Sequence, residues 1–391
     1  MNSTEEECRG CEIMEKDAHV RFLELMYYML PSPYESQEIN HLTLAYFVIS
    51  GLDILNSLHK VAKDAVISWV LSFQAHPGAK ADLNDGQFYG FHGSKTSQFP
   101  PDENGVLIHN NSHLASTYCA ISILKIVGYE LSNLDSETIV TSMRNLQQPD
   151  GRYGLKLGLQ LWLLYLCSGE IKLVNSQPFF IFVVYVKTYA ANDMLNFISI
   201  HTGGETDLRF VYCAATICFM LDNWSGMDKE KTKDYILRCQ SYDGGFGLVP
   251  GAESHGGATY CAIASLRLMG FIGDNILSSC ASSSLIDAPL LLDWILQRQG
   301  TDGGFQGRPN KSSDTCYAFW IGAVLRILGG CKFVDSKALR GFLLSCQYKY
   351  GGFGKFPGEY PDLYHSYYGV TAFSLLEESA LKSLCSELGI H

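Results

Sequence analysis

A short phrase built on glycine and phenylalanine recurs along the chain and limits its fold more than any other feature. Glycine pairs permit the positive φ angles of a tight turn, and the phenylalanine that follows can pin the turn to a core. Each copy follows one apolar, helical-looking segment and precedes another, in which apolar residues recur at three- and four-residue steps. The copies read LQQPDGR at 146–152, CQSYDGGFG at 239–247, RQGTDGGFQG at 298–307 and CQYKYGGFG at 346–354, with a looser version at 73–91.

A helix, a glycine turn and a second helix, repeated roughly every 50 residues, describe an array of helical hairpins. Open helical solenoids have similar periods but lack this glycine phrase. We therefore predict an all-α protein with an α/α toroid, a barrel of repeated helical hairpins whose inner helices face a central cavity. The barrel is expected over residues 21–376, with a flexible acidic N-terminal tail at 1–20 and a C-terminal tail at 377–391.

The spacing of the phrase is even except at one place. Its glutamines stand at positions 147, 240, 299 and 347, so the steps are 93, 59 and 48 residues. Removing the 44 residues from Tyr153 to Asn196 would shorten the first step to 49. That segment has almost no charge and no glycine phrase, and its apolar runs are too short to span a bilayer. We interpret 153–196 as an insertion in a turn of the barrel, and the alternative is a genuine extra helical hairpin.

Composition and charge argue against several functions. The chain has 391 residues, 47% of them apolar, and a net charge of -11, which argues against a nucleic-acid partner held by bulk charge. No apolar run is long enough for a membrane span, and the acidic N-terminus is unlike a signal peptide. Most of the 13 cysteines lie in apolar segments such as STYCAISIL, where cysteine behaves as a small buried hydrophobe. This usage indicates a reducing compartment, so we expect a cytoplasmic protein.

Three residues near the end of the chain combine the side chains of a metal site. Asp314 and Cys316 stand two apart where a helix is expected to begin, and His365 opens a later helix. A carboxylate, a thiolate and an imidazole are good Zn²⁺ ligands, and three protein ligands leave one position open for chemistry. The alternative is a helix-capping aspartate beside a core cysteine. The metal interpretation predicts one catalytic zinc ion per chain, and these residues by themselves leave both interpretations open.

A basic set lies close to these residues in the sequence. Arg308 and Lys311 precede Asp314, Tyr317 follows it, and His255 heads another expected inner helix. Cations, a phenol and a helix N-terminus together favour a phosphate-bearing ligand. Taken singly, surface arginine and lysine are ordinary solvated charges, so this prediction depends on the set converging at one cavity mouth.

Together these motifs resemble the β subunits of protein prenyltransferases. The resemblance runs from about Thr43 to Gly369, interrupted only by 153–196. It implies a barrel whose apolar cavity holds an isoprenoid diphosphate, with the aspartate, cysteine and histidine above as zinc ligands. It also implies transfer of the isoprenoid to the cysteine of a C-terminal CaaX motif, in a heterodimer with a helical α subunit that contributes a diphosphate-contacting lysine. The positions that match the family's isoprenoid- and diphosphate-binding residues are Thr43, Arg209, His255, Gly257, Arg308, Lys311, Tyr317, Trp320 and Lys355.

Two of these positions distinguish branches of the family. Thr43 stands where farnesyl enzymes place a bulky tryptophan, so the resemblance implies room for a C20 chain. Lys355 stands where the farnesyl enzyme has an aspartate associated with Mg²⁺, so Mg²⁺ is not expected to be required. Both favour type I geranylgeranyl transfer, from geranylgeranyl diphosphate to CaaX proteins such as Rho-type small GTPases, with leucine as X. The alternatives are a farnesyl-transferring β subunit and an inactive isoform disrupted by the insertion.

Overall fold

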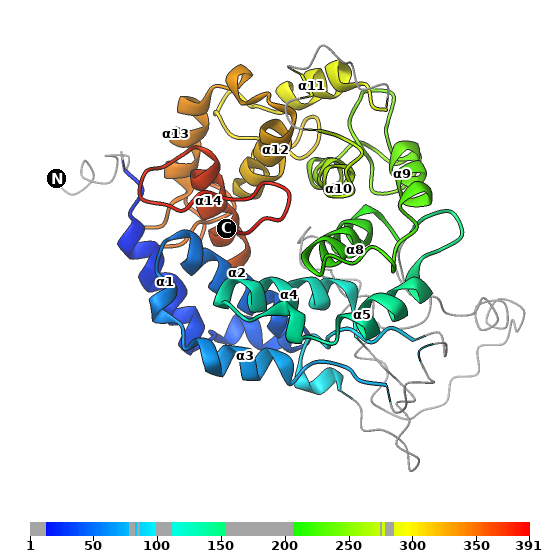
Figure 1. Ribbon diagram of the computed structural model, residues 1–391. Helices are drawn as coiled ribbons and strands as arrows, with labels where there is room; N and C mark the ends of the chain where they lie inside the picture. Colours follow the sequence, from blue (N-terminus) through cyan, green and yellow to red (C-terminus); the bar gives the residue numbers. More distant parts are fainter. Residues whose placement is uncertain are drawn as a thin grey trace, which may run out of the picture.

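The computed structural model describes residues 13–77, 83, 87–98, 112–152, 206–273, 276–277 and 285–391. Over these ranges the chain forms an inner and an outer ring of helices around one axis (Figure 1). The inner helices are α2 (His41–Ile54), α4 (Leu114–Val127), α8 (Leu208–Met220), α10 (Gly256–Leu268), α12 (Thr315–Leu328) and α14 (Leu363–Leu375). The outer helices are α1 (Lys16–Tyr28), α3 (Lys63–Leu71), α5 (Ser136–Met143), α9 (Lys229–Arg238), α11 (Ala288–Leu296) and α13 (Ser336–Cys346).

The inner ring is closed. Each inner helix packs against the next from α2 to α14, and α14 packs back on α2. The two rings differ because inner helices such as α10 have neighbours on every side and bury nearly every residue, whereas outer α9 buries Thr232, Tyr235 and Ile236 along one face and carries charges on the other. No helix in the described ranges is long and apolar enough to cross a membrane. The closed α/α toroid predicted from the glycine phrase is confirmed.

The glycine phrase forms a turn that holds the start of the next outer helix. In the copy at 298–307, Gly303 has a φ of +87°, and an added Cβ would stand 2.4 Å from the carbonyl oxygen of Ala338 in α13. Oε1 of Gln299 accepts a hydrogen bond from the main-chain nitrogen of Asp335 at 3.1 Å, and its Nε2 donates to the carbonyl oxygen of the same residue at 3.0 Å. The glycine permits the close approach, and the glutamine fixes it.

The last copy of the phrase uses the same contacts to close the outer ring. Oε1 of Gln347 accepts from the main-chain nitrogen of Glu15 at 2.9 Å, just before α1, and Gly351 lies against the carbonyl oxygen of Ala18 with a φ of +100°. The flexible tail predicted for 1–20 is therefore too long, because α1 begins at Lys16 and its first turn is needed to complete the ring.

A buried histidine lies in this joint. His19 is 1% exposed, its Nδ1 accepts from the main-chain nitrogen of Gly352 at 2.9 Å, and its ring stacks on Phe353 with centroids 4.4 Å apart. Burial lowers its pKa to about 4, although a hydrogen bond with Gln347 opposes the shift. A protonated Nδ1 could not accept the hydrogen bond from Gly352, so the ring closure depends on the neutral imidazole.

We expect this joint to make the fold sensitive to acid. A histidine with a folded pKa below its unfolded value near 6.5 takes up a proton on unfolding, so its contribution to stability is present above pH 6.5 and is lost as the pH falls towards 4. At pH 5 the loss from His19 is about 2 kcal/mol. Urea unfolding at pH 7 and pH 5 should show a smaller pH effect in His19→Gln than in the wild type. Some effect should persist, because burial also lowers the pKa of His92 and His113 to about 4. Identical pH profiles for variant and wild type would contradict the expectation.

The predicted insertion, 153–196, lies outside the described residues, which end at Arg152 and resume at Thr206. Nη1 of Arg152 donates to Oγ1 of Thr206 at 3.2 Å, so the two ends that border the gap are neighbours. Gly151, with a φ of +92°, packs against the carbonyl oxygen of Lys231 in α9, as the other phrase glycines pack on their outer helices. Because α8 also packs directly on α4, the described residues close the ring by themselves.

Deleting 153–196 is therefore expected to leave the ring intact. The residues at 197–205 would then join Arg152 to Thr206, whose side chains already form a hydrogen bond with each other. The variant should keep the wild-type helical circular dichroism, a cooperative thermal transition and its bound metal. A broad, non-cooperative transition would contradict the insertion interpretation and favour the extra hairpin.

The C-terminal residues do not form the predicted free tail. They turn back into the ring, where Nζ of Lys382 lies 2.7 Å from the buried carboxylate of Asp53 on α2, and Leu388 and Ile390 are buried. Figure 1 marks the C-terminus near the centre of the ring. The segment has no helical periodicity, so its burial depends on partners from the ring and not on a pattern of its own. We call residues 377–391 the C-terminal cap.

Candidate active site

The site lies at one end of the inner ring, where the inner helices other than α2 begin with capping side chains. The first N–H groups of a helix lack partners within it, so a side-chain acceptor stabilises this end, which also carries the positive end of the helix dipole. Asp207 and Asp314 cap α8 and α12 by accepting from the N–H two residues later, at 2.9 Å each. His255 caps α10 in the same way, with Gly257 as the donor at 3.0 Å. The capping residues of α4 and α14 are His113 and Asp362.

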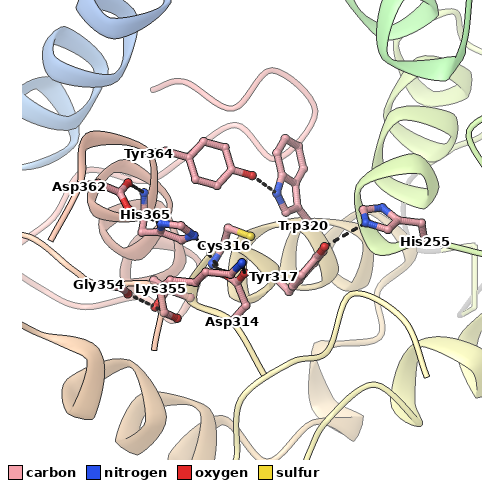
Figure 2. A network of polar contacts seen from close by, with 11 residues as sticks. His255, Asp314, Cys316, Tyr317, Trp320, Gly354, Lys355, Asp362, Tyr364 and His365 are labelled. Carbon is pink, nitrogen blue, oxygen red and sulfur yellow. Dashed lines mark hydrogen bonds and ion pairs between the residues drawn. The ribbon is translucent and has the colours of Figure 1, made fainter. Parts of the chain in front are cut away.

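Asp314, Cys316 and His365 come together at this end, as the sequence predicted (Figure 2). All three are buried, and one donor atom of each lies within 4.8 Å of the other two. Nδ1 of His365 is 2.6 Å from Oδ2 of Asp362, which leaves Nε2 to face the other two residues. That Nε2 makes no hydrogen bond within the described part of the chain and lies 3.4 Å from Oδ1 of Asp314. An orphaned nitrogen, a carboxylate and a thiol facing one another fit a metal ion, and we call them the metal-donor triad.

The electrostatics of the triad also suit a cation. Burial by itself lowers the pKa of His365, but the carboxylates of Asp314 and Asp362 outweigh burial and raise the pKa to about 9. Burial, and then the Asp314 carboxylate, raise the pKa of the Cys316 thiol. The pocket thus holds a positive charge as a proton on His365 when it contains no metal. Metal binding would release that proton, because metal ligands bind in their deprotonated forms.

Asp362 is a site residue that the sequence reasoning missed, because in the sequence it resembles an ordinary helix cap. Its Oδ1 does accept from the main-chain nitrogen of His365 at 2.8 Å, but its Oδ2 also holds the imidazole. Carboxylates in this position orient a metal-binding histidine. We expect Asp362→Ala to weaken metal binding about 10- to 100-fold, and Asp362→Asn, which keeps an acceptor, to weaken it less. Competition with a chromophoric chelator measures both, and wild-type affinity in the alanine variant would show that Asp362 only caps α14.

A second polar group lies beside the triad, at the starts of α10 and α12. Nε2 of His255 lies 2.9 Å from Oη of Tyr317. Because Nδ1 of His255 accepts from Gly257, Nε2 carries the hydrogen in the neutral ring and donates it to Tyr317. Gly307 permits this approach, since an added Cβ there would stand 2.0 Å from Cζ of Tyr317. The pair stands at helix N-termini, where an anion is favoured.

The three predicted cations lie on loops near these groups. Arg308 is partly exposed, and its Nη1 is 3.4 Å from Oε2 of Glu253. Lys311, on the same loop, is exposed, and neither of these two residues lines the central cavity. Lys355 is partly buried, and its Nζ lies 3.9 Å from Oδ2 of Asp314. Of the three, Lys355 therefore stands at the triad itself.

The inner helices enclose a cavity of about 220 Å³ with a mainly aromatic wall. One fixed wall residue is Trp320, whose Nε1 donates to Oη of Tyr364 at 3.2 Å, as Figure 2 shows. Another is Arg209, whose Nη2 is 2.7 Å from Oδ2 of Asp207. The predicted site residues that line the cavity are Thr43, Arg209, His255, Gly257 and Trp320.

The wall also contains tyrosines that the sequence reasoning missed. One stands five residues after the capping residue of each of α4, α8, α10 and α14. The signal is visible in the sequence as the repeated tripeptides TYC, VYC, TYC and SYY, which we had interpreted only as parts of apolar helices. The helix cap His113 was missed as well, although SH stands before both TYC segments. The four tyrosines are Tyr118, Tyr212, Tyr260 and Tyr367.

The sequence matches the family model of the prenyltransferase alpha-alpha toroid domain over residues 14–390. The chain belongs to this prenyltransferase family. It is 60% identical over 376 residues to the geranylgeranyl transferase type-1 subunit beta of Arabidopsis thaliana, which covers 96% of this chain and 88% of that relative. The subunit of the same name from Dictyostelium discoideum is 34% identical over 357 residues, 88% of this chain and 86% of the relative.

A solved structure within the same family has the same fold. Candida albicans protein geranylgeranyltransferase-I complexed with GGPP superposes with a TM-score of 0.73 at 23% identity, over 96% of both chains. The family model and the 60% identity confirm the family predicted from the glycine phrase and the site motifs, and the matched domain includes residues 14–20 and 377–390 of the two predicted tails.

Proposed function

We propose that this chain is the catalytic β subunit of a type I protein geranylgeranyltransferase. The observation that carries the proposal is the metal-donor triad placed next to polar helix N-termini and an aromatic cavity. The 60% identity to a type-1 β subunit over nearly the whole of both chains supports the same assignment. In the reaction, the sulfur of a CaaX cysteine bonds to C1 of the geranylgeranyl group, the bond from C1 to the diphosphate oxygen breaks, and the thiol proton is released.

The metal-donor triad would hold Zn²⁺, because thiolate, imidazole and carboxylate are the donors that zinc prefers. Bound zinc would act as a Lewis acid that lowers the pKa of a substrate thiol and so favours the thiolate, its nucleophilic form. Asp362 holds Nδ1 of His365, so that Nε2 faces the donor atoms of Asp314 and Cys316. The triad is buried, so its electrostatic effect on a bound thiol is little screened by water.

The polar residues beside the triad would bind the diphosphate and stabilise the charge that builds on it as it leaves. His255 and Tyr317 stand at the N-termini of α10 and α12. The contact of Arg308 with Glu253 is long and partly exposed, and such a pair contributes little, so the guanidinium can turn to an anion at small cost. Lys355 brings a positive charge next to the triad, which supports a reaction that does not need Mg²⁺.

The aromatic cavity would hold the hydrocarbon. Thr43 lines it, with Sγ of Cys119 3.8 Å from its Oγ1. Two small side chains leave space that a tryptophan at position 43 would fill, which supports a C20 over a C15 chain. As in the relatives named subunit beta, we propose that the chain works with an α subunit, on cytoplasmic CaaX proteins that end in leucine, such as Rho-type small GTPases.

A transfer assay tests the proposal. The chain is co-purified with a prenyltransferase α subunit and given geranylgeranyl or farnesyl diphosphate, with fluorescent peptides ending in CaaL or CaaS. We expect the highest kcat/KM with geranylgeranyl diphosphate and CaaL, unchanged when Mg²⁺ is omitted. Preference for farnesyl diphosphate and CaaS, with a need for Mg²⁺, would move the chain to the farnesyl branch. A folded, metal-loaded heterodimer that transfers neither lipid would support the inactive isoform.

A further inference from the structure

A continuous ring of aromatic side chains surrounds the axis of the toroid. Tyr46 on α2 lies between Tyr118 and Tyr367, with hydroxyl oxygens 2.8 and 2.7 Å away. The ring continues from Tyr118 to Tyr212 at a centroid distance of 5.7 Å, from Tyr212 to Tyr260 at 5.2 Å, and from Tyr260 to Phe319 at 5.1 Å. Tyr368 closes the circle, with its ring centroid 5.1 Å from that of Phe319 and 4.9 Å from that of Tyr367, so every inner helix contributes to the aromatic ring.

The hydroxyl groups of this aromatic ring bind the main chain of the C-terminal cap. Tyr260 donates to the carbonyl oxygen of Ser386 at 3.0 Å. Tyr212 donates to that of Glu387 at 3.1 Å, and Tyr118 to that of Leu388 at 3.1 Å. Tyr367 donates to the carbonyl oxygen of Gly389. Four consecutive carbonyls are therefore held by four different inner helices, which fixes the cap in the middle of the ring.

The cap is anchored outside the aromatic ring as well. Nζ of Lys382 pairs with the buried Asp53, and Nε of Arg267 is 3.4 Å from Oε1 of Glu387. Within the cap, the main-chain nitrogen of Cys385 donates to the carbonyl oxygen of Ile390 at 2.8 Å, and Ile390 is fully buried. These contacts make the cap a fixed wall, because moving it would break several buried polar interactions together.

One residue of the cap, Gly389, lines the same cavity as Thr43 and Trp320. Its φ is +70°, and an added Cβ would stand 3.4 Å from Oη of Tyr46, 3.4 Å from Oη of Tyr367 and 3.7 Å from Cζ of Phe319. A side chain at position 389 would therefore enter the space between these aromatic groups. Glycine leaves this space open because it has no side chain.

We propose that the C-terminal cap, through Gly389, forms the floor that limits the length of the isoprenoid chain. This inference rests on the proposed function and adds a second determinant of lipid length, at the opposite end of the sequence from Thr43. A rigid wall discriminates by excluding chain atoms that have no space, and one extra or missing group at such a wall changes kcat/KM by about 10- to 200-fold.

The experiment places a side chain at position 389 and measures the preference between the two lipids. Gly389→Ala and Gly389→Val are purified with the α subunit, and kcat/KM and the dissociation constant are measured for geranylgeranyl and farnesyl diphosphate. We expect the ratio of farnesyl to geranylgeranyl efficiency to rise about tenfold or more in the valine variant and less in the alanine variant. Geranylgeranyl diphosphate should bind more weakly, while farnesyl diphosphate binding changes little.

Gly128→Ala is the matched control. Gly128 ends inner helix α4 with a φ of +85°, and an added Cβ would meet nothing within 4 Å, so this variant carries the same backbone strain without entering the cavity. Its lipid ratio should equal that of the wild type. If Gly389 variants fold and keep the wild-type ratio, the floor proposal is wrong. If the wild type binds neither lipid, the proposed function fails instead.

A variant that loosens the floor, where the Gly389 variants fill it, keeps the proposal testable should the Gly389 variants not fold. Tyr212→Phe keeps the ring of aromatic side chains but removes the hydroxyl that holds the carbonyl of Glu387. A loosened floor should reduce the discrimination against a longer C25 prenyl diphosphate, measured as the ratio of C25 to C20 efficiency. Folded Tyr212→Phe with the wild-type C25 to C20 ratio would count against the floor.

Discussion

Replacing Cys316 by alanine is expected to give a folded protein that no longer retains its metal. In the proposed site Cys316 would supply the thiolate of a three-ligand set, so its loss would leave one imidazole and one carboxylate, which do not form a zinc site of the usual kind. The loss of a ligand should exceed the 10- to 100-fold effect typical of removing a residue that only orients a ligand. Elemental analysis should find about one zinc ion per wild-type chain and a negligible amount in the variant.

The matched control for this experiment is Cys218→Ala. Cys218 is a fully buried thiol on inner helix α8 that does not line the cavity. Both substitutions remove the same atoms from a packed interior, so a similar fall in thermal stability with different metal content would isolate the ligand role. Cobalt(II) substitution adds a second readout, because a thiolate-to-metal absorption band should appear in the wild type and the control alone. Undiminished metal in Cys316→Ala would remove Cys316 from the site.

Replacing Gly351 by alanine is expected to destabilise the whole toroid. Gly351 has a φ of +100°, and an added Cβ would stand 2.0 Å from the carbonyl oxygen of Ala18, in the joint that closes the outer ring. A left-handed conformation costs an L-residue about 1–2 kcal/mol, and overpacking against main chain adds about 1–3 kcal/mol. The free energy of unfolding from urea titration should fall by roughly 2–5 kcal/mol.

Gly358→Ala separates the cost of a left-handed main chain from the cost of overpacking against a neighbour. Gly358 has a φ of +82°, but an added Cβ would meet nothing within 4 Å, so only the conformational cost applies. Gly303→Ala repeats the clash at an internal joint, 2.4 Å from the carbonyl oxygen of Ala338. The expected order of destabilisation places Gly351 and Gly303 together, both above Gly358. Equal losses for Gly351→Ala and Gly358→Ala would mean that the contact with α1 does not stabilise the ring.

The sequence predicted the closed ring because the glycine phrase has one structural role in every repeat. Gly303 requires a left-handed φ and a close main-chain neighbour, and those local requirements are visible in a single sequence. The chain ends were mispredicted for the opposite reason. The cap has no periodicity, and its position depends on tyrosine hydroxyls from helices far away in the sequence, such as that of Tyr118.

Some residues of the candidate site could likewise be predicted from the sequence, and others could not. The metal-donor triad could be predicted because the side chains of aspartate, cysteine and histidine are themselves metal ligands, whatever their surroundings. Asp362 could not be distinguished from a helix cap, since its second role depends on the rotamer of His365. Arg308 and Lys311 were expected at the cavity mouth, but the structure has them on a partly exposed loop outside the cavity lining. Charge and spacing do not specify how far a loop side chain reaches.

Both ends of the chain are needed to complete the toroid, and this affects how the protein is made. Helix α1 precedes every other helix that the structure describes, yet its start is held by Gln347, and the C-terminal cap in the middle of the ring follows all of these helices. Because the ribosome makes the cap after every ring helix, the ring can be completed only once all of these helices have been synthesised. Until then α2 lacks its contact with α14, and the start of α1 lacks Gln347, so apolar surface of these early helices stays exposed, as in other large domains during synthesis. That exposed surface makes the incomplete ring prone to aggregation until its last segments have been made.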